Sequence, residues 1–459
     1  MNKRHRRISP GTVIMLMITC VVLVGCAMVL PGLMGSTSVQ IDVREVLSVL
    51  QLGDIPTLSL NDIPITQSTS GTSGTSGTSG TSSLSSSTPA ANPQETIAPI
   101  EASATAAPTA TPTVKAGGSF TLTIGGSVCM DDAVRKAGYY SDSQKYDFTE
   151  MLSLLTDEMT GDMTMLSLEN LILPDSKVSS LNAPDAVSDL LRECGVQMVA
   201  LGFDQVYDKG TDGVQSTLSS LQSRNLTVIG AYASQEEASR LCIKTLGGVP
   251  VAFLHYTEAL STTGTKAMKS SGDAYAVKLA DSDTIAADIA QARAQGAAVV
   301  IVSVNWGKSG ASKPTNAQRT LAQEIADAGA DVIVGTGTRV VQPIAWLTRK
   351  SDDGTIAQTL CAWSLGSLLN ESRKDGNVAA ILLHLQISWD GERISFGQVS
   401  YTPTYIWRQK KDGQYQYRVV ASDCDAPGGM SDDQQGYMAK ALKNIQSALA
   451  DSPVVIREK

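Results

Sequence analysis

Residues 299–346, VVIVSVNWGKSGASKPTNAQRTLAQEIADAGADVIVGTGTRVVQPIAW, decide the fold of this chain. The apolar run 297–304 is typical of a strand buried on both faces, and residues 331–334 form a second such run. Between them, Thr315 caps a predicted helix that ends at Gly329. The apolar positions of this helix fall on one stripe: Ala317, Leu321, Ile325 and Ala328. A strand, a helix and a second strand in this order predict a βαβ unit with parallel strands.

A polar loop follows each of these strands at its carboxyl end, where open parallel sheets hold their ligands. The loop at 305–310 reads NWGKSG, and the loop at 335–339 reads GTGTR. Acidic residues also follow two further predicted strands, at 163–168 and 197–201. We therefore expect one cleft, and its candidate residues are Glu169, Asp204, Asn305, Trp306, Lys308 and Arg339.

The composition of the 459 residues limits the possible functions. The formal net charge is −9, and without the four basic residues of the first eleven positions it is −13, which argues against nucleic acid as a partner. The cysteines beyond residue 117 show no paired spacing, so a disulfide stays open: Cys129, Cys194, Cys242, Cys361 and Cys424. Histidines number only three, too few for several kinds of catalytic site.

The N-terminal segment predicts a membrane anchor. Residues 1–11 are basic, and residues 12–34 are mostly apolar and carry no charge, which is long enough to span a bilayer with the N-terminus in the cytoplasm. The alternative is a lipoprotein signal, because LVGC at 23–26 resembles a lipobox and would place a lipid on Cys26. Both interpretations place the main domain outside the cell, tethered to the cell membrane.

Residues 35–117 combine a short mildly apolar segment with a tract rich in Ser, Thr, Gly and Pro. Such a tract cannot offset the entropy lost on ordering, so we expect a disordered linker. Residues 118–459 form the predicted extracellular domain. Helices and strands alternate through its first two thirds, and strands at 356–363, 377–389 and 392–401 then follow one another. This pattern is typical of an α/β fold with added antiparallel strands.

The order of motifs in this domain resembles that of the poly-γ-glutamate capsule synthesis (CapA) family. The matching motifs are GSV at 126–128, SLE at 167–169, DKG at 208–210, NWG at 305–307, VVQPIAW at 340–346, SLG at 364–366 and PTYIWR at 403–408. The resemblance implies a layered sandwich with mixed β-sheets, of the calcineurin-like metallophosphatase type. It also implies a role in synthesis of a capsule or another polymer of the cell envelope.

The chain departs from the family at the positions that would hold metal. Acid, asparagine and histidine are replaced there by Ser127, Ser167, Gln205, Asn305, Arg339 and Ser367. Glu169 is the one ligand that still matches. A two-metal site needs converging imidazoles and carboxylates, and hydroxyl and amide groups are poor substitutes. His255 and His384 lie in apolar runs, where a hydrogen-bonded strand histidine is expected. We therefore expect no metal and no other cofactor.

Three functions remain open. In the first, the domain has lost catalysis and binds or scaffolds an anionic envelope polymer resembling poly-γ-glutamate, with Trp306, Lys308 and Arg339 as a cationic and aromatic pocket floor. These three side chains would equally serve to brace their loops. In the second, the domain is a metal-dependent hydrolase or transferase that uses Glu169 or Asp204 as acid or base. In the third, it docks on other subunits of a membrane-bound capsule synthesis complex.

Overall fold

A computed structural model of the chain describes residues 117–174, 182–350, 354, 356–411 and 413–458. All of them belong to the unit Ala106–Lys459. The predicted tail, membrane anchor and linker lie outside the described residues, apart from residue 117, and so stay predictions. Within the described part of the chain, no helix is long and apolar enough to cross a membrane.

The predicted βαβ unit is confirmed. Strand β11 (Val299–Asn305) pairs in parallel with β12 (Val332–Thr336), and helix α9 (Asn316–Asp327) connects them. Thr315 caps α9, and Gln318 folds back to complete a capping box. Of the predicted apolar stripe, Ile325 is buried, Leu321 and Ala328 are partly buried against the core, and Ala317 is exposed. Gln318, Ala322 and Ala326 complete the buried face.

This unit lies at the centre of a mixed sheet in the order β13-β14-β12-β11-β10-β9. Its four central strands are parallel, and an antiparallel strand closes each edge. The other strands of this sheet are β9 (Cys242–Leu246), β10 (Val249–Thr257), β13 (Ile344–Lys350) and β14 (Ile356–Ala362).

A second mixed sheet has the order β19-β18-β16-β1-β4-β7-β8, with three short strands joined to it. From β1 to β8 its strands are parallel, and from β1 to β19 they are antiparallel. Its strands are β1 (Gly118–Val128), β4 (Met163–Leu168), β7 (Met198–Ala200), β8 (Thr227–Ile229), β15 (Ser367–Leu369), β16 (Ala379–Trp389), β17 (Ile394–Phe396), β18 (Ser400–Lys411), β19 (Gln414–Ala421) and β20 (Val455–Ile456).

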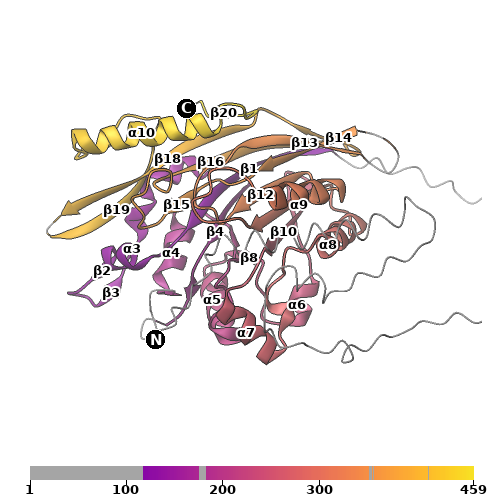
Figure 1. Cartoon of the computed structure of the whole chain (residues 1–459), viewed down its shortest axis with the longest axis horizontal. Coiled ribbons are helices and arrows are strands. Elements are labelled where there is room, and N and C mark those ends of the chain that lie inside the picture. Colours follow the sequence, from indigo (N-terminus) through magenta and orange to yellow (C-terminus); the bar gives the residue numbers. More distant parts are fainter. Residues whose placement is uncertain (1–116, 175–181, 351–353, 355, 412, 459) are drawn as a thin grey trace, which may run out of the picture. The chain divides into compact units, whose positions relative to one another are not determined.

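The two sheets pack face to face, with helices on their outer faces (Figure 1). Apolar side chains from both sheets fill the space between them, among them Ile124, Phe253 and Ile301. Helices α4 (Ala186–Glu193) and α5 (Gly210–Ser223) cover the sheet that contains β1. Helices α8 (Ser282–Ala294) and α9 cover the sheet that contains β11. The predicted layered sandwich with mixed sheets is therefore observed.

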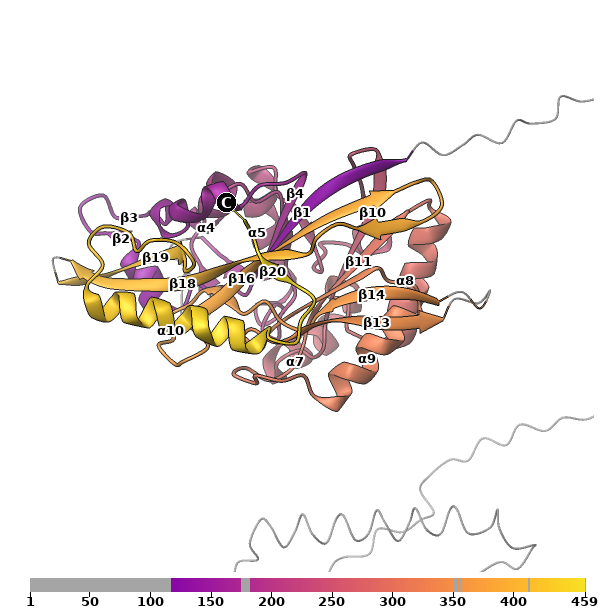
Figure 2. The ribbon, with the colours of Figure 1, turned by 90° about the horizontal axis from the view of Figure 1, so that it is seen from above.

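Helix α10 (Asp432–Ala448) packs on β16 and β18, alongside the second sheet (Figure 2). Ser431 caps it through a capping box with Gln434. The remaining helices are α3 (Asp132–Ala137), α6 (Gln235–Ser239), α7 (Thr262–Ser271) and the 3-10 turns Thr149–Met151, Ser153–Glu158 and Ala274–Ala276. Two small ribbons pair β2 (Tyr139–Tyr140) with β3 (Lys145–Tyr146) and β5 (Leu171–Ile172) with β6 (Asn182–Ala183).

Two strands are longer than the sequence suggested. Gly125, Gly126 and Ser127, a sequence typical of a turn, lie within β1, because Gly126 brings the backbone against the carbonyl of Gly366, where a Cβ atom would be only 2.4 Å from the oxygen. Strand β18 continues through Pro403 to Lys411, since it pairs with β16 on one side and β19 on the other. Close backbone approach and cross-strand pairing therefore override two local turn signals.

Candidate functional site

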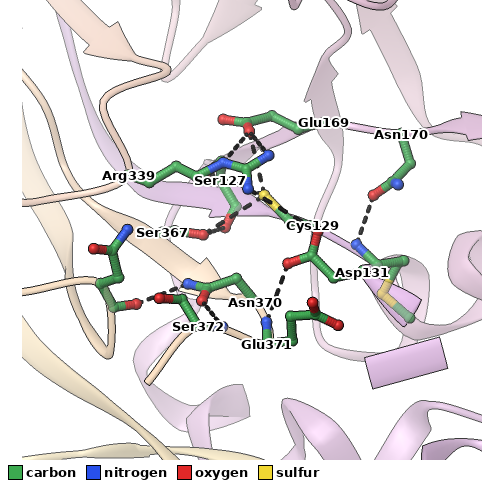
Figure 3. A network of polar contacts seen from close by, with 12 residues as sticks. Ser127, Cys129, Asp131, Glu169, Asn170, Arg339, Ser367, Asn370, Glu371 and Ser372 are labelled. Carbon is green, nitrogen blue, oxygen red and sulfur yellow. Dashed lines mark hydrogen bonds and ion pairs between the residues drawn. The ribbon is translucent and has the colours of Figure 1, made fainter. Parts of the chain in front are cut away.

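The carboxyl ends of the parallel strands bring polar side chains from both sheets together (Figure 3). Cys129 and Asp131 follow β1, Glu169 follows β4, and Arg339 lies in the loop after β12. The β1 and β4 ends are locked to each other, because the Glu169 amide donates to the carbonyl of Val128 over 3.0 Å. The polar network therefore forms at the strand ends where the sequence placed several of the candidate residues.

An ion pair between Arg339 and Glu169 lies at the centre of the network. Both Nε and Nη2 of Arg339 are 2.9 Å from Oε2 of Glu169. The Glu169 side chain is 6% exposed, whereas that of Arg339 is 32% exposed. Arg339 also has φ +60°, a left-handed conformation that non-glycine residues seldom adopt. The loop is thus held in an unfavourable backbone conformation while its guanidinium reaches the buried carboxylate.

Cys129 completes the buried side of this pair. Its thiol donates to Oε2 of Glu169 over 3.3 Å and lies 3.7 Å from the hydroxyls of Ser127 and Ser367. Burial, and then the negative charge of Glu169, raise the pKa of the Cys129 thiol well above its usual value. The thiol is therefore a neutral hydrogen-bond donor at neutral pH and not a ready nucleophile.

The network does not form a positive pocket. Nη1 of Arg339 lies 4.0 Å from Oδ1 of Asp131, so two carboxylates face one guanidinium. Burial raises the pKa of Asp131. Oε1 of Glu169 is buried and has no hydrogen-bond partner among the described residues. The predicted fixed positive charge of Arg339 is therefore compensated within the fold.

The loop 305–310 contributes differently from the prediction. Trp306 is 1% exposed, stacks on Trp363 at a ring distance of 5.7 Å and donates Nε1 to the Trp363 carbonyl. It belongs to the core beneath α9, so the predicted role of Trp306 as an aromatic pocket floor is wrong. Asn305 donates to Thr336 over 3.2 Å and joins the two loops. Lys308 is exposed and forms no ion pair with a described residue.

Asp204 lies in the turn after β7, within electrostatic reach of the same network. Its side chain is exposed, and partial desolvation followed by the charge of Glu169 raises its pKa. Its backbone carbonyl accepts a hydrogen bond from the amide of Ser261 over 2.6 Å. Asp204 is therefore an exposed member of this group of residues, whereas the side chain of Glu169 is buried.

The residues at the family's metal positions do not fit a metal. Ser127 and Ser367 are fully buried and hydrogen-bonded within the network, and Ser167 is 5% exposed. The available carboxylate of Glu169 is already bound by Arg339. Within the described part of the chain, no group of three or more His, Cys, Asp or Glu side chains is placed to hold a metal ion. A guanidinium, two hydroxyls and a protonated thiol provide no set of metal ligands.

Both strand histidines are satisfied, as predicted. His255 bonds Ser303 over 3.0 Å and the carbonyl of Gly202 over 3.1 Å. His384 bonds Thr123 over 3.1 Å and Thr402 over 2.9 Å. Burial lowers the pKa of His255 to about 4 and that of His384 to about 3. Both rings are neutral structural groups at physiological pH.

Sequence reasoning missed Cys129 and Asp131 as members of the site. A signal was present, because both follow the GSV motif at the end of a strand whose neighbours already supplied candidates. The thiols of Cys129, Cys194, Cys242 and Cys361 are free. The arrangement as a whole consists of a buried carboxylate paired with an arginine, a neutral thiol and an exposed carboxylate.

Comparison with known proteins connects this site to a family. The model for the bacterial capsule synthesis protein PGA_cap matches residues 121–372. The PGA biosynthesis protein CapA of Bacillus subtilis (strain 168) is 30% identical over 156 residues, which are 34% of this chain and 40% of that protein. The capsule biosynthesis protein CapA of Bacillus anthracis is 27% identical over 165 residues, 35% of this chain and 39% of that protein. Each match spans less than half of the relative.

Solved structures with a similar arrangement have low sequence identity. The calcineurin-like phosphoesterase YfkN of Bacillus subtilis is 12% identical with a TM-score of 0.34, and the match covers 72% of this chain and 99% of that one. A hypothetical protein from Thermus thermophilus is 16% identical with a TM-score of 0.32, covering 60% of this chain and 98% of that one. Because the family model covers more than half of the sequence, this chain belongs to the bacterial capsule synthesis protein PGA_cap family.

Proposed function

We propose that this protein is a non-catalytic binding or scaffold component in the synthesis of a capsule or another envelope polymer. Membership of the PGA_cap family supports a role in capsule synthesis. The relatives are named as biosynthesis proteins for PGA and for capsule, which supports an acidic polymer of the poly-γ-glutamate type as a partner. Other subunits of a capsule synthesis complex are further partners under this proposal. The uncharged segment 12–34 would hold the domain on the outer face of the cell membrane.

The observation that carries the proposal is the ion pair between Arg339 and Glu169. In a two-metal hydrolase, carboxylates and imidazoles hold cations that polarise a phosphoryl oxygen and deprotonate water. Here the guanidinium already neutralises the one matching carboxylate, through two contacts of 2.9 Å to its Oε2. A divalent cation would have to displace a covalently tethered positive charge and find its remaining ligands among hydroxyls. The cleft therefore keeps its architecture without the ligands for this chemistry.

One observation favours the alternative of a hydrolase or transferase acting on an envelope polymer. Desolvation raises the pKa of Asp204, a carboxyl at the rim of the cleft, and a raised pKa suits a general acid. This alternative needs a metal or a second catalytic group near Asp204. The metal experiment separates the two functions.

The test is the metal content of the purified full chain. We expect no stoichiometric zinc, manganese or iron by elemental analysis, and no change in melting temperature when Mn²⁺ or Zn²⁺ is added, since a ligand that binds only the native state must raise it. Phosphomonoester, phosphodiester and γ-glutamyl substrates should not turn over. The matched control is Glu169→Gln, which removes the one matching ligand. Like the wild type, it should contain no metal, and added metal should not change its melting temperature. If the wild type bound one or two equivalents of metal that this variant loses, or if a chelator abolished turnover, the hydrolase alternative would be favoured instead.

A further inference from the structure

A cavity of about 1230 Å³ lies at the amino ends of β11 and β12, whereas Glu169 lies near the carboxyl ends of the parallel strands. Residues of the β13–β14 hairpin and of the β16–β17 hairpin line it. Strands β13 and β14 are labelled on the right of Figure 1. Residues directly before β11 and β12 contribute to it, whereas the polar network follows the far ends of those strands. Strand β11 has seven residues at about 3.3 Å each, so the two places are roughly 20 Å apart. The cavity is therefore separate from the family's cleft.

Three aromatic side chains line this cavity: Trp346 of β13, Trp389 of β16 and Phe396 of β17. All three are half-buried, and part of each packs on the core between the sheets. The rings of Trp346 and Phe396 meet edge to face, 5.0 Å apart at 70°. These contacts fix the orientation of the rings while another part of each stays open to the cavity. Rigid, partly open aromatic surfaces suit stacking with a ligand at a small cost in side-chain entropy.

The polar part of the cavity has nearly balanced charge. In its floor, Arg293 and Arg349 clamp the carboxylate of Asp331, at 2.6 Å and 2.9 Å. Both arginines are thus held by Asp331, and Nε of Arg349 is buried beneath the cavity surface. At the rim, Arg393 and Glu392 are exposed and of opposite sign. Three basic and two acidic residues line a cavity on an acidic protein, which gives little attraction for a polyanion.

We propose that this cavity binds a segment of a neutral saccharide chain. A sugar ring presents an apolar face of C–H groups to an aromatic ring, and its hydroxyls exchange hydrogen bonds with charged and amide side chains at its edge. The aromatic walls match the first requirement, and the exposed side chains of Gln358 and Arg393 match the second. The volume exceeds the roughly 300–1,000 Å³ of pockets for drug-sized ligands, which leaves room for more than one ring. This inference goes beyond the proposed function, because it assigns a second ligand class to a separate place on the domain.

The test measures saccharide binding to the full chain in a detergent without a sugar headgroup. The probes are tetrasaccharides of N-acetylglucosamine and of glucose, followed by calorimetry and tryptophan fluorescence, with poly-γ-glutamate as the charged comparison. We expect one of the tetrasaccharides to bind, and Trp389→Ala and Trp346→Ala to weaken it at least about tenfold. Tyr437→Ala is the matched control, because Tyr437 is an aromatic residue 58% exposed on α10 and outside the cavity. It should bind as the wild type does.

A second variant guards against loss of folding in the tryptophan variants. Gln358 and Arg393 are exposed, so Gln358→Ala combined with Arg393→Ala should keep the melting temperature and still weaken binding at least about threefold. If neither tetrasaccharide binds to the wild type, the proposal is overturned. Binding that these variants leave unchanged, or binding of poly-γ-glutamate alone, also overturns it. Metal bound at Glu169 would contradict the proposed non-catalytic role, but it would not affect the conclusion about saccharide binding in the cavity.

Discussion

Arg339 faces both Glu169 and Asp131 at the centre of the candidate site. A side chain that sequence reasoning expected to offer a free positive charge is instead held by Glu169 at 2.9 Å, with Asp131 4.0 Å away. A buried carboxylate needs a compensating charge, and in this fold a protein side chain provides it. The loop that carries Arg339 adopts φ +60° to do so, which indicates that the pair is worth more than the local strain.

Replacing Arg339 by alanine should therefore destabilise the protein. The change leaves the carboxylate of Glu169, 6% exposed, without its partner, and we expect a loss of about 1–3 kcal/mol in the free energy of unfolding, below the value for a fully buried pair because Arg339 is partly exposed. Urea denaturation measures it. Adding Glu169→Gln to Arg339→Ala removes the stranded charge and should recover part of the loss. A single variant as stable as the wild type would contradict the assigned role of the pair.

Neutral His255 predicts a loss of stability in acid. The unfolded chain takes up a proton below about pH 6.5, whereas the native ring does so only near its lowered pKa of about 4. Stability should thus fall as the pH drops from 6.5 to 4, by up to about 3 kcal/mol for this one residue. Urea denaturation across that range, in the wild type and in His255→Asn, measures the difference.

The comparison with the variant is needed because other groups act in the opposite direction. Asp131 and Asp204 have raised pKa values, so the native state binds their protons at higher pH than the unfolded chain does, which favours folding as the pH falls. His255→Asn should be less stable than the wild type at pH 7.5 and show a weaker dependence on pH between 6.5 and 4. Equal slopes would mean that the ring is not buried in its neutral form.

At the scale of elements, helix α9 positions the loops that meet at the site. It begins at Asn316, after residues 311–315 that follow the loop 305–310, and ends before β12, whose far end leads to Arg339. The amide of Gly310 donates to the carbonyl of Thr338 over 2.7 Å, so the two loops are joined directly. A secure start of α9 therefore supports both loops.

The N-cap of α9 gives a prediction at this scale. Thr315→Ala removes the hydroxyl that accepts from the Gln318 amide and should cost about 1 kcal/mol of stability. Thr315→Ser keeps the hydroxyl and is the matched control, which should be close to the wild type. Thermal or urea denaturation of the three proteins measures the effect. If alanine and serine gave equal losses, the methyl group of Thr315 would be the important part and not its cap.

At the scale of the whole molecule, the proposed topology can be tested on intact cells. The anchor at 12–34 and the linker rich in Ser and Thr would leave the domain accessible from outside. Added protease should cut within 68–113 and release a folded fragment that begins near residue 116, detected by mass spectrometry. A cytoplasmic protein serves as the control for lysis. Cleavage that occurs only after lysis would show that the orientation is reversed.

The sequence by itself determined the βαβ unit, the mixed sheets and the grouping of polar residues at the carboxyl ends of the parallel strands. These features depend on the spacing of apolar residues and on caps such as Thr315, which act within a few positions of one another. The sequence also predicted that His255 and His384 would be satisfied strand residues, because each lies within an apolar run. The family followed from the order of the motifs.

Only the tertiary structure decided what the site residues do. Arg339 and Glu169 are 170 positions apart in the chain, so no local pattern could show that they neutralise each other. Trp306 looked like a binding residue beside a polar loop, but its ring turns into the core against Trp363, 57 positions away. The cavity between the hairpins likewise exists only because two sheets distant in sequence meet. Side-chain direction and charge compensation depend on long-range contacts, whereas the elements themselves depend on local periodicity.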